Sequence, residues 1–198
     1  IAAQAGSYEF MGVSENDGTG RSVSSAGDVD GNELADLLIS APEADNGDDN
    51  HGKTYLITAA DLAKADAADE TVDGIIDLAN IGLGEGSQLT GSYVFVGEGA
   101  EQYATDNVTS LGDIDGDLKD DFLISAPRAQ NNAGQTFLVS SRDLVLADAA
   151  DEVVDGVINL ANIAAQQHSY SLTGGENGLS GASVSSAGDV DKDGKEDL

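Results

Sequence analysis

Short apolar runs separated by polar loops recur along the chain and predict β-strands. The runs at 36–42 (DLLISAP) and 121–127 (DFLISAP) each end at a proline, and their length and continuous apolar character are typical of strands buried on both faces. The segments at 52–58 (GKTYLIT) and 134–140 (GQTFLVS) are rich in β-forming residues and predict the next strand of each unit. A looser alternation at 21–26 predicts the strand that precedes them.

An alanine-rich stretch follows these strands and predicts a short helix of at most about three turns. Thr58 and Ser140 each stand three residues before an aspartate, Asp61 and Asp143, which resembles the start of a capping box. An Asp-Gly pair, at 73–74 or 155–156, ends each helical insert. The apolar segments SYEFMG and SYSLTG then predict a fourth strand. Four strands with a small helical insert is the pattern of a β-propeller blade.

The same elements return along the chain, so the architecture is a repeat. Residues 27–42 (GDVDGNELADLLISAP) return at 112–127 as GDIDGDLKDDFLISAP, and a third copy begins at Gly188. The insert at 58–81 matches the one at 140–163.

We therefore expect an all-β fold: a β-propeller fragment of four-stranded antiparallel blades with short helical inserts, about 2.5 repeats of about 80 residues. Residues 1–198 are expected to be part of one propeller domain and a piece of a longer array. Its segments are the last strand of a preceding blade, a first full repeat, a second full repeat and the start of a third, at 1–12, 13–91, 92–174 and 175–198.

Composition narrows the functional classes. The chain has 37 Asp and Glu against 8 Lys and Arg, a net charge of −29, which excludes a simple nucleic-acid interface and disfavours docking on anionic lipid. No cysteine is present, so disulfides and zinc–thiolate sites are excluded. No apolar run approaches the roughly 20 residues that span a bilayer, and no signal peptide is visible. A halophilic surface and a set of cation sites both remain compatible with this acidity, whereas disorder conflicts with the repeated apolar segments.

The acids concentrate in three nine-residue loops that precede the buried strands. Each loop places oxygen-bearing side chains at positions 1, 3, 5 and 9, and the backbone carbonyl of position 7 would face the same centre. Alternate residues can surround one ion when the chain curls around it, and an all-oxygen set favours Ca²⁺. The candidate ligands are Asp28, Asp30, Asn32, Leu34 and Asp36 in the first loop, Asp113, Asp115, Asp117, Lys119 and Asp121 in the second, and Asp189, Asp191, Asp193, Lys195 and Asp197 in the third.

Electrostatic repulsion supports a bound cation. Two carboxylates about 5 Å apart repel by roughly 3 kcal/mol at an effective dielectric of about 20. A helix–loop–helix calcium hand needs a glutamate at position 12, where this chain has Ile39 and Ile124. Tandem nonapeptides of a calcium β-roll are absent from the sequence. Solvated acidic turns without an ion remain the alternative, and Mg²⁺ fits less well because it retains its waters.

The segment at 20–42, GRSVSSAGDVDGNELADLLISAP, resembles the FG-GAP repeat of integrin α-subunit β-propellers and of many bacterial extracellular proteins. Thr19 and Ser180 stand where the family has phenylalanine, and Glu33 and Leu118 replace the loop glycine that Gly194 retains. The resemblance implies one propeller, usually of seven blades, in which the calcium loop joins the first two strands of a blade. It also implies a secreted or surface protein that acts in adhesion.

Catalytic residues are not expected. His51 and His168 lie near no nucleophile motif, and paired carboxylates fit metal better than glycoside hydrolysis. The leading hypothesis is a non-enzymatic calcium-binding module, with Ca²⁺ as cofactor, that binds a protein or glycan outside the cell, alongside the remaining blades. An accessory, non-catalytic domain of a secreted hydrolase is the alternative.

The sequence also carries expectations for three further acidic segments. The acids of the inserts, such as Asp66 and Asp148, are expected on an exposed helix face. Asp45, Asp48 and Asp49 are expected in a solvated loop, and the third metal loop is expected to be only partly formed.

Overall fold

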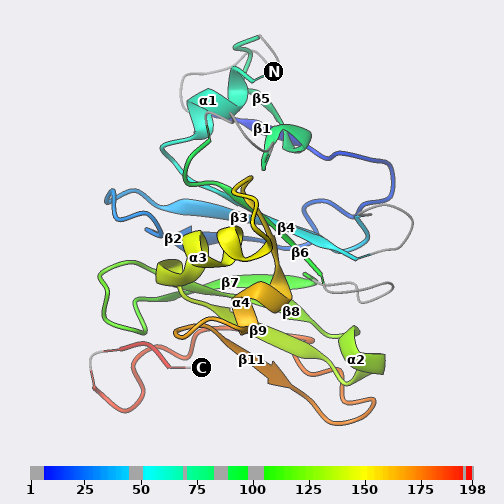
Figure 1. Ribbon diagram of the computed structural model, residues 1–198, viewed down its shortest axis with the longest axis vertical. Coiled ribbons are helices and arrows are strands. Elements are labelled where there is room, and N and C mark those ends of the chain that lie inside the picture. Colours follow the sequence, from blue (N-terminus) through cyan, green and yellow to red (C-terminus); the bar gives the residue numbers. More distant parts are fainter. Residues whose placement is uncertain are drawn as a thin grey trace.

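The computed structural model of the chain describes residues 7–44, 51–68, 71–82, 89–97, 105–193 and 195–197. It is rich in β-sheet with few and short helices, and its two main sheets lie one above the other (Figure 1). The all-β expectation is therefore confirmed at the level of fold class.

The first main sheet is an antiparallel meander of four strands with a fifth strand at its edge. The meander runs through β2 (Val23–Gly27), β3 (Asp36–Ala41), β4 (Lys53–Ile57) and β6 (Tyr93–Val96). The fifth strand, β10 (Val157–Asn159), comes from the second unit and pairs with β6 in parallel.

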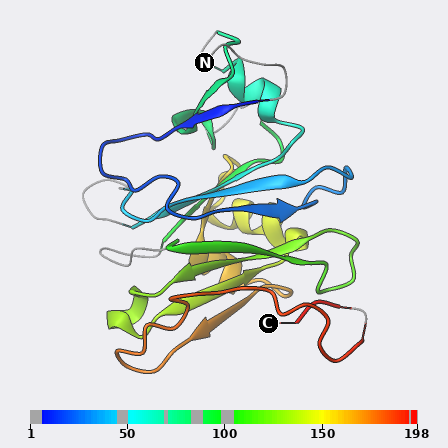
Figure 2. The ribbon, with the colours of Figure 1, turned by 180° about the vertical axis from the view of Figure 1, so that it is seen from behind.

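The second main sheet repeats this meander without the fifth strand. Its four antiparallel strands are β7 (Asn107–Gly112), β8 (Asp121–Ala126), β9 (Gln135–Val139) and β11 (Tyr170–Thr173). Seen from behind, the two sheets are stacked with β2 nearest to β7 (Figure 2).

The core lies between the two sheets. Leu38 and Phe95 of the first sheet and Phe122 and Phe137 of the second are at most 2% exposed and belong to one cluster. The rings of Phe95 and Phe122 meet edge to face with centroids 5.7 Å apart. Such aromatic pairs add to the free energy of apolar burial and fix the spacing of the sheets.

Both main sheets also bury part of the face that points away from the other sheet. Ile39 and Tyr55 pack in a second cluster on the far side of the first sheet, and Leu123 packs against Val184 on the far side of the second. The apolar runs of β3 and β8 are thus buried on both faces, as their continuous pattern predicts.

Each unit carries an insert between its third and fourth strands. The first insert comprises α1 (Leu62–Asp66), β5 (Ile75–Asp77) and η1 (Leu78–Asn80). The second comprises η2 (Ser141–Asp143), α3 (Leu144–Asp148), η3 (Ala149–Asp151), β10 and α4 (Leu160–Ala164). Short helices were expected here, and the structure has them; the short strands β5 and β10 were not predicted.

The inserts reach back to the preceding unit. β5 pairs in parallel with β1 (Glu9–Met11), as β10 does with β6, so each insert extends the outer strand of the unit before it. β6 is the fourth strand of the first sheet and lies in the segment that the sequence assigns to the second repeat.

The remaining helical element is the turn α2 (Ala129–Asn132), whose two central residues have a φ of 56°. Among the described residues, no helix is long and apolar enough to cross a membrane.

Two acids of the inserts are buried, contrary to the sequence interpretation, whereas Asp73 and Asp151 are exposed. Asp66 and Asp148 are each only 4% exposed, and their carboxylates accept the N–H of Gly74 at 2.8 Å and of Gly156 at 2.9 Å. Each carboxylate thus fixes the turn that leads into β5 or β10. A helical pattern places these residues on one face, but the chain turns back over that face and buries it.

The capping-box expectation is confirmed only in part, because Ser140 Oγ accepts the N–H of Arg142 at 3.3 Å as a helix cap. The carboxylate of Asp143 does not return to the backbone of Ser140; instead it accepts the Oγ–H of Ser169 at 2.9 Å and the backbone N–H of His168 at 2.9 Å. Asp61 accepts the corresponding Oγ–H of Ser92 at 3.1 Å and N–H of Gly91 at 3.0 Å. These aspartates tie the start of each insert to the strand that follows it.

We expect Asp148→Ala to destabilise the protein by about 1–3 kcal/mol, because the half-buried N–H of Gly156 would lose its acceptor. The exposed Asp151 in the same turn provides the control, and Asp151→Ala should change the free energy of unfolding by less than about 0.5 kcal/mol. Urea denaturation of both variants measures the difference. Equal losses would mean that the Asp148 carboxylate does not hold the turn.

Candidate metal centre

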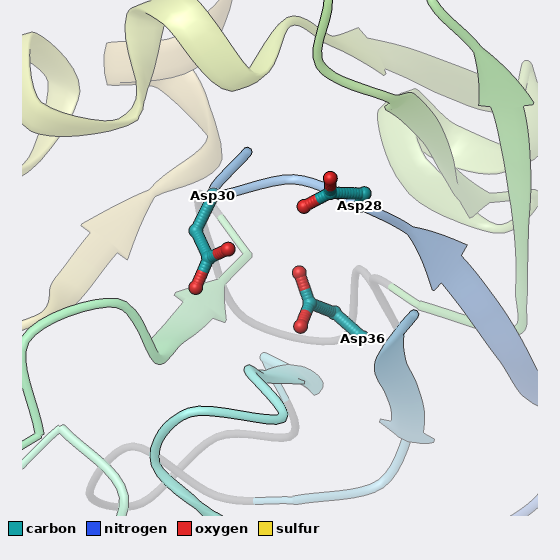
Figure 3. A group of neighbouring side chains, drawn as sticks. All are labelled: Asp28, Asp30 and Asp36. Carbon is teal, nitrogen blue, oxygen red and sulfur yellow. The ribbon is translucent and has the colours of Figure 1, made fainter. Parts of the chain in front are cut away.

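The structure brings together three carboxylates in each acidic loop. Oxygens of the residues at positions 1, 3 and 9 all lie within 4.8 Å of one another in each case. The groups are Asp28, Asp30 and Asp36; Asp113, Asp115 and Asp121; and Asp189, Asp191 and Asp197. Figure 3 shows the first group, in which the three carboxylates point toward a common centre between β2 and β3. Such a group could hold a metal ion.

The carboxylate at position 1 shapes the loop. Asp28 accepts the N–H of Gly31 at 2.8 Å, of Asn32 at 2.9 Å and of Glu33 at 2.7 Å. Burial opposes the charged form of Asp28, but these N–H groups outweigh it and hold its pKa below the usual range. Asp113 makes the corresponding three bonds in the second loop, so the curl does not depend on the residues between.

The carboxylate at position 9 opens the buried strand and is itself buried. Asp121 is 0% exposed and accepts the N–H of Ile114 at 3.1 Å and of Ser141 at 2.9 Å. Asp36 makes the equivalent bonds to Val29 and Ala59. One carboxylate therefore joins the loop, the strand and the start of the insert.

Burial and neighbouring acids make the charged form of position 9 unfavourable. Burial, with additional repulsion from Asp115 and Asp117, raises the pKa of Asp121 to about 6. Burial, with repulsion from Asp30 and Asp28, also raises the pKa of Asp36. A cation at the centre of each group would reverse this effect by pairing with the charged form.

At position 5, Asp117 and Asp193 lie outside these carboxylate groups, and Asn32 donates a side-chain N–H to the Asp30 carboxylate at 2.9 Å. Asn32 accepts the N–H of Leu34 at 2.7 Å, Asp117 that of Lys119 at 2.9 Å, and Asp193 that of Lys195 at 2.8 Å. Position 5 therefore supports the backbone at position 7. The metal contacts expected from position 5 and from the carbonyls of position 7 stay predictions.

The backbone conformation at position 6 is one that glycine adopts most easily. Glu33 has a φ of 68° and Leu118 a φ of 71°, in the left-handed region that favours glycine. Gly194, the equivalent residue of the third loop, lies outside the described residues. Two of the three loops thus place a side chain where the backbone is strained.

Leu118→Gly should therefore stabilise the protein by about 1 kcal/mol, since it relieves the left-handed strain. The side chain of Leu118 is 87% exposed, so little packing is lost. Leu118→Ala is the matched control, because it removes the same side chain but keeps the strained Cβ. Thermal denaturation measures both variants, and equal melting temperatures would show that position 6 carries no strain.

The described residues of the third loop gather their carboxylates as the other two loops do, and the expectation that this loop is only partly formed stays a prediction. The carboxylate of Asp197 accepts the N–H of Val190 at 2.8 Å, which matches the bond from Ile114 to Asp121. The difference is burial, because Asp189 and Asp191 are exposed and Asp197 is half-buried.

Neighbouring loops contact one another through position 8, a role that sequence reasoning missed. Asp120 accepts the N–H of Asp28 at 2.8 Å and donates its own N–H to the Asp28 carbonyl at 2.9 Å. A Cβ at Gly27 would lie 2.1 Å from the Asp120 carboxylate, so only glycine fits there. The sequence carries a signal for this contact: an acid at position 8 and a glycine just before the preceding loop. Asp120 lies against Gly27 in this way, and Glu196 lies against Gly112.

The second loop also has a positively charged side chain beside it. Arg142 lies with its guanidinium 3.7 Å from Asp115 and 3.5 Å from Asp117, and it is 41% exposed. Ala60 holds the matching position in the first insert, so this charge is specific to the second unit.

The remaining sequence candidates do not form a catalytic arrangement among the described residues. His168 Nδ1 lies 3.0 Å from the Asp143 carboxylate, which is one of the contacts that anchor the insert. His51 is half-buried at the start of β4. The acids Asp45, Asp48 and Asp49 lie outside the described residues.

Comparison with known proteins adds no identity to this geometry. No protein-family model matches the chain, and the search of curated proteins gave no significant match.

Proposed function

We propose that the chain is a calcium-binding β-propeller module of the FG-GAP type that mediates an extracellular interaction or adhesion. One observation carries the proposal: three loops, a repeat apart, gather the carboxylates at positions 1, 3 and 9 in the same arrangement. Surface acidity alone would scatter the acids and would not repeat one arrangement three times.

The residues fit a hard divalent cation. Three carboxylates converge in each loop, and carboxylate oxygen is the ligand that Ca²⁺ and Mg²⁺ prefer. In the two better buried loops, Asp36 and Asp121 stand at strand starts where an uncompensated charge is costly. Ca²⁺ is favoured over Mg²⁺ because it accepts a flexible protein cage, whereas Mg²⁺ dehydrates reluctantly.

Three features support the propeller part of the proposal. Two four-stranded antiparallel units pack face to face, and their inner strands β2 and β7 are neighbours. The segment after β11 covers the outer face of the second unit through Val184, as a third unit would. Repetition of this packing would arrange the units around an axis.

The proposed role is binding and not catalysis. The acids that could act in catalysis by residue type lie instead in the three carboxylate groups or hold the backbone of the inserts. The partner would be a protein or a glycan outside the cell, and an extracellular setting would supply the millimolar Ca²⁺ that such modules use.

Calorimetric titration of the chelator-treated protein with Ca²⁺ tests the metal part. We expect as many sites as there are carboxylate groups, namely the three described above, with dissociation constants of about 10⁻⁴–10⁻³ M. Asp30→Asn should remove one site, because it keeps the size of a half-exposed side chain and removes one charged ligand.

The control is Glu15→Gln, which removes one exposed charge outside the three loops and should leave the stoichiometry unchanged. Mg²⁺ should bind more weakly than Ca²⁺. A stoichiometry that is the same in both variants, or equal binding of the two ions, would exclude the proposed sites.

A further inference from the structure

We infer that the outer edge of β11 is a docking site for a parallel strand of the β5 and β10 type, carried by a further unit of the same kind. This inference concerns how units join and does not depend on bound calcium. It rests on the two equivalent strands of the same chain, β1 and β6, which each pair in parallel with a strand of an insert.

Three outer strands share one sequence pattern. β1, β6 and β11 lie in the segments SYEFMG, SYVFVG and SYSLTG, at 7–12, 92–97 and 169–174. β6 and β11 also have the same register on their inner side: Val94 is paired with Tyr55 in β4, and Ser171 with Phe137 in β9. β11 therefore presents its outer edge as β6 does.

Two of these three edges are covered, and in the same way. Glu9 is aligned with Ile75 in the pair of β1 and β5, and Val94 with Val157 in the pair of β6 and β10. In both pairs a backbone N–H of the outer strand donates at 2.8 Å to the carbonyl of a glycine, Gly74 or Gly156. β11 has no strand on this side among the described residues.

β11 is also more exposed than β6, whose Tyr93 and Phe95 lie in the cluster between the two sheets. Tyr93 of β6 is 8% exposed and Phe95 is 0% exposed, whereas the equivalent Tyr170 and Leu172 are 60% and 48% exposed. All four residues of β11 are exposed, and all four of β6 are buried. An unpaired edge with exposed apolar side chains is a template for strand addition.

The structure also defines the chemistry of the occupant. In both bound strands a glycine with positive φ accepts the N–H of the outer strand, and the next residue but one is an isoleucine that is 0% exposed, Ile76 or Ile158. The carboxylate of Asp66 or Asp148 holds the glycine N–H, so the strand is presented in its bound shape. The occupant of β11 is thus a glycine, an aliphatic residue and an isoleucine after an aspartate-held turn.

The register follows from the two covered edges. The N–H of Ser171 donates to the glycine carbonyl of the incoming strand, and Leu172 lies beside its isoleucine, as Phe95 lies beside Ile158. A slip of one residue would turn that isoleucine to the opposite face of the sheet.

A labelled peptide with the sequence of residues 148–164, which holds the turn and β10, tests binding to the intact chain by fluorescence anisotropy. We expect saturable binding that is weakened about tenfold or more by Ser171→Pro, which removes the outward N–H. Ser171→Ala is the matched control, because it loses the Oγ contact with Gln135 but keeps the N–H, and it should bind as the native chain does.

Thiol trapping tests the register with a second readout. The chain has no cysteine, so Leu172→Cys supplies a single thiol. In a glutathione buffer this thiol should form a mixed disulfide with a peptide carrying Ile158→Cys at least about tenfold more than with one carrying Val157→Cys, because only aligned residues on one face bring their Cα atoms within disulfide range.

Three outcomes would overturn the inference. They are equal trapping of the two peptides, equal binding by the proline and alanine variants, and a Leu172→Cys homodimer that excludes the peptide. The last would show that the edge pairs with a second copy of the chain.

Discussion

Ca²⁺ at 10 mM should raise the melting temperature of this protein by about 8–30 °C relative to a chelator. With dissociation constants of about 10⁻⁴–10⁻³ M the ion is at roughly 10 to 100 times its dissociation constant, which stabilises the folded state by about 1.4–2.7 kcal/mol a site, so three sites contribute about 4–8 kcal/mol. This is of the order of a whole domain's stability, about 5–15 kcal/mol. For a chain of this length, each kcal/mol changes the melting temperature by roughly 2–4 °C.

The physical reason is the cost of the empty carboxylate groups. Each group holds three acids within 4.8 Å, in a chain with a net charge of −29. Differential scanning calorimetry with 10 mM Ca²⁺, with 10 mM Mg²⁺ and with chelator measures the effect. NaCl at matched ionic strength is the control for screening, because screening weakens repulsion between exposed acids without filling the sites.

A melting temperature that NaCl raises as much as Ca²⁺ would identify the loops as solvated acidic turns. The variant Asp30→Asn should lower the Ca²⁺-dependent part of the shift by about a third, since one of three sites is lost. Glu15→Gln should keep the whole shift.

Without a divalent cation, the protein should lose stability as the pH rises from about 4.5 to 7. The folded-state pKa of Asp121 is about 6, above the unfolded value of about 3.9. The folded state therefore holds the proton more tightly, so the stabilisation is complete below the unfolded pKa and is lost as the pH rises through 6. The loss from this residue is about 3 kcal/mol, from roughly two pKa units at 1.36 kcal/mol each.

Asp36 acts in the same direction, because burial also raises its pKa. Asp61 and Asp143 act in the opposite direction below pH 4. Burial opposes their charge, but Lys64 for Asp61 and His168 for Asp143 are the strongest of the contacts that outweigh it and lower their pKa. Their stabilisation is present above the unfolded pKa and is lost as the pH falls, so maximum stability in chelator should lie near pH 4–5.

Ca²⁺ should remove this loss, because a cation pairs with the charged form of Asp121. Urea denaturation across the pH range, with chelator and with 10 mM Ca²⁺, measures both curves. Asp121→Asn should flatten the curve in chelator, and Glu176→Gln, at an exposed acid, should not. A curve in chelator that rises between pH 5 and 7 would contradict the burial of an uncompensated charge.

The sequence by itself determined the elements that depend on local pattern. The apolar runs at 36–42 and 121–127 predicted strands buried on both faces, and the alternation of oxygen-bearing residues predicted the three carboxylate groups. Both predictions rest on short-range geometry: a strand alternates its side chains, and a nine-residue loop can gather acids only if they recur at fixed spacing.

The tertiary structure decided which acids are bound and to what. A helical pattern assigned Asp66 and Asp148 to solvent, yet the returning chain buries both carboxylates against the N–H groups of glycines. At position 5 of the loops the structure shows a side chain that holds the N–H of position 7, and the metal contact expected there stays a prediction. In the inserts and in the loops alike, the side-chain oxygen accepts whichever backbone N–H lies nearest to it, and only the folded chain shows which N–H that is.

Contacts between units were likewise beyond the sequence pattern. β10 leaves its own unit to pair with β6, and Asp120 reaches Asp28, 92 residues away. Such pairings depend on which edge and which N–H remain unsatisfied after each meander has formed, a property of the assembled sheets. The sequence thus determined the repeating unit and its candidate metal ligands, and the folded chain decided how neighbouring units are joined.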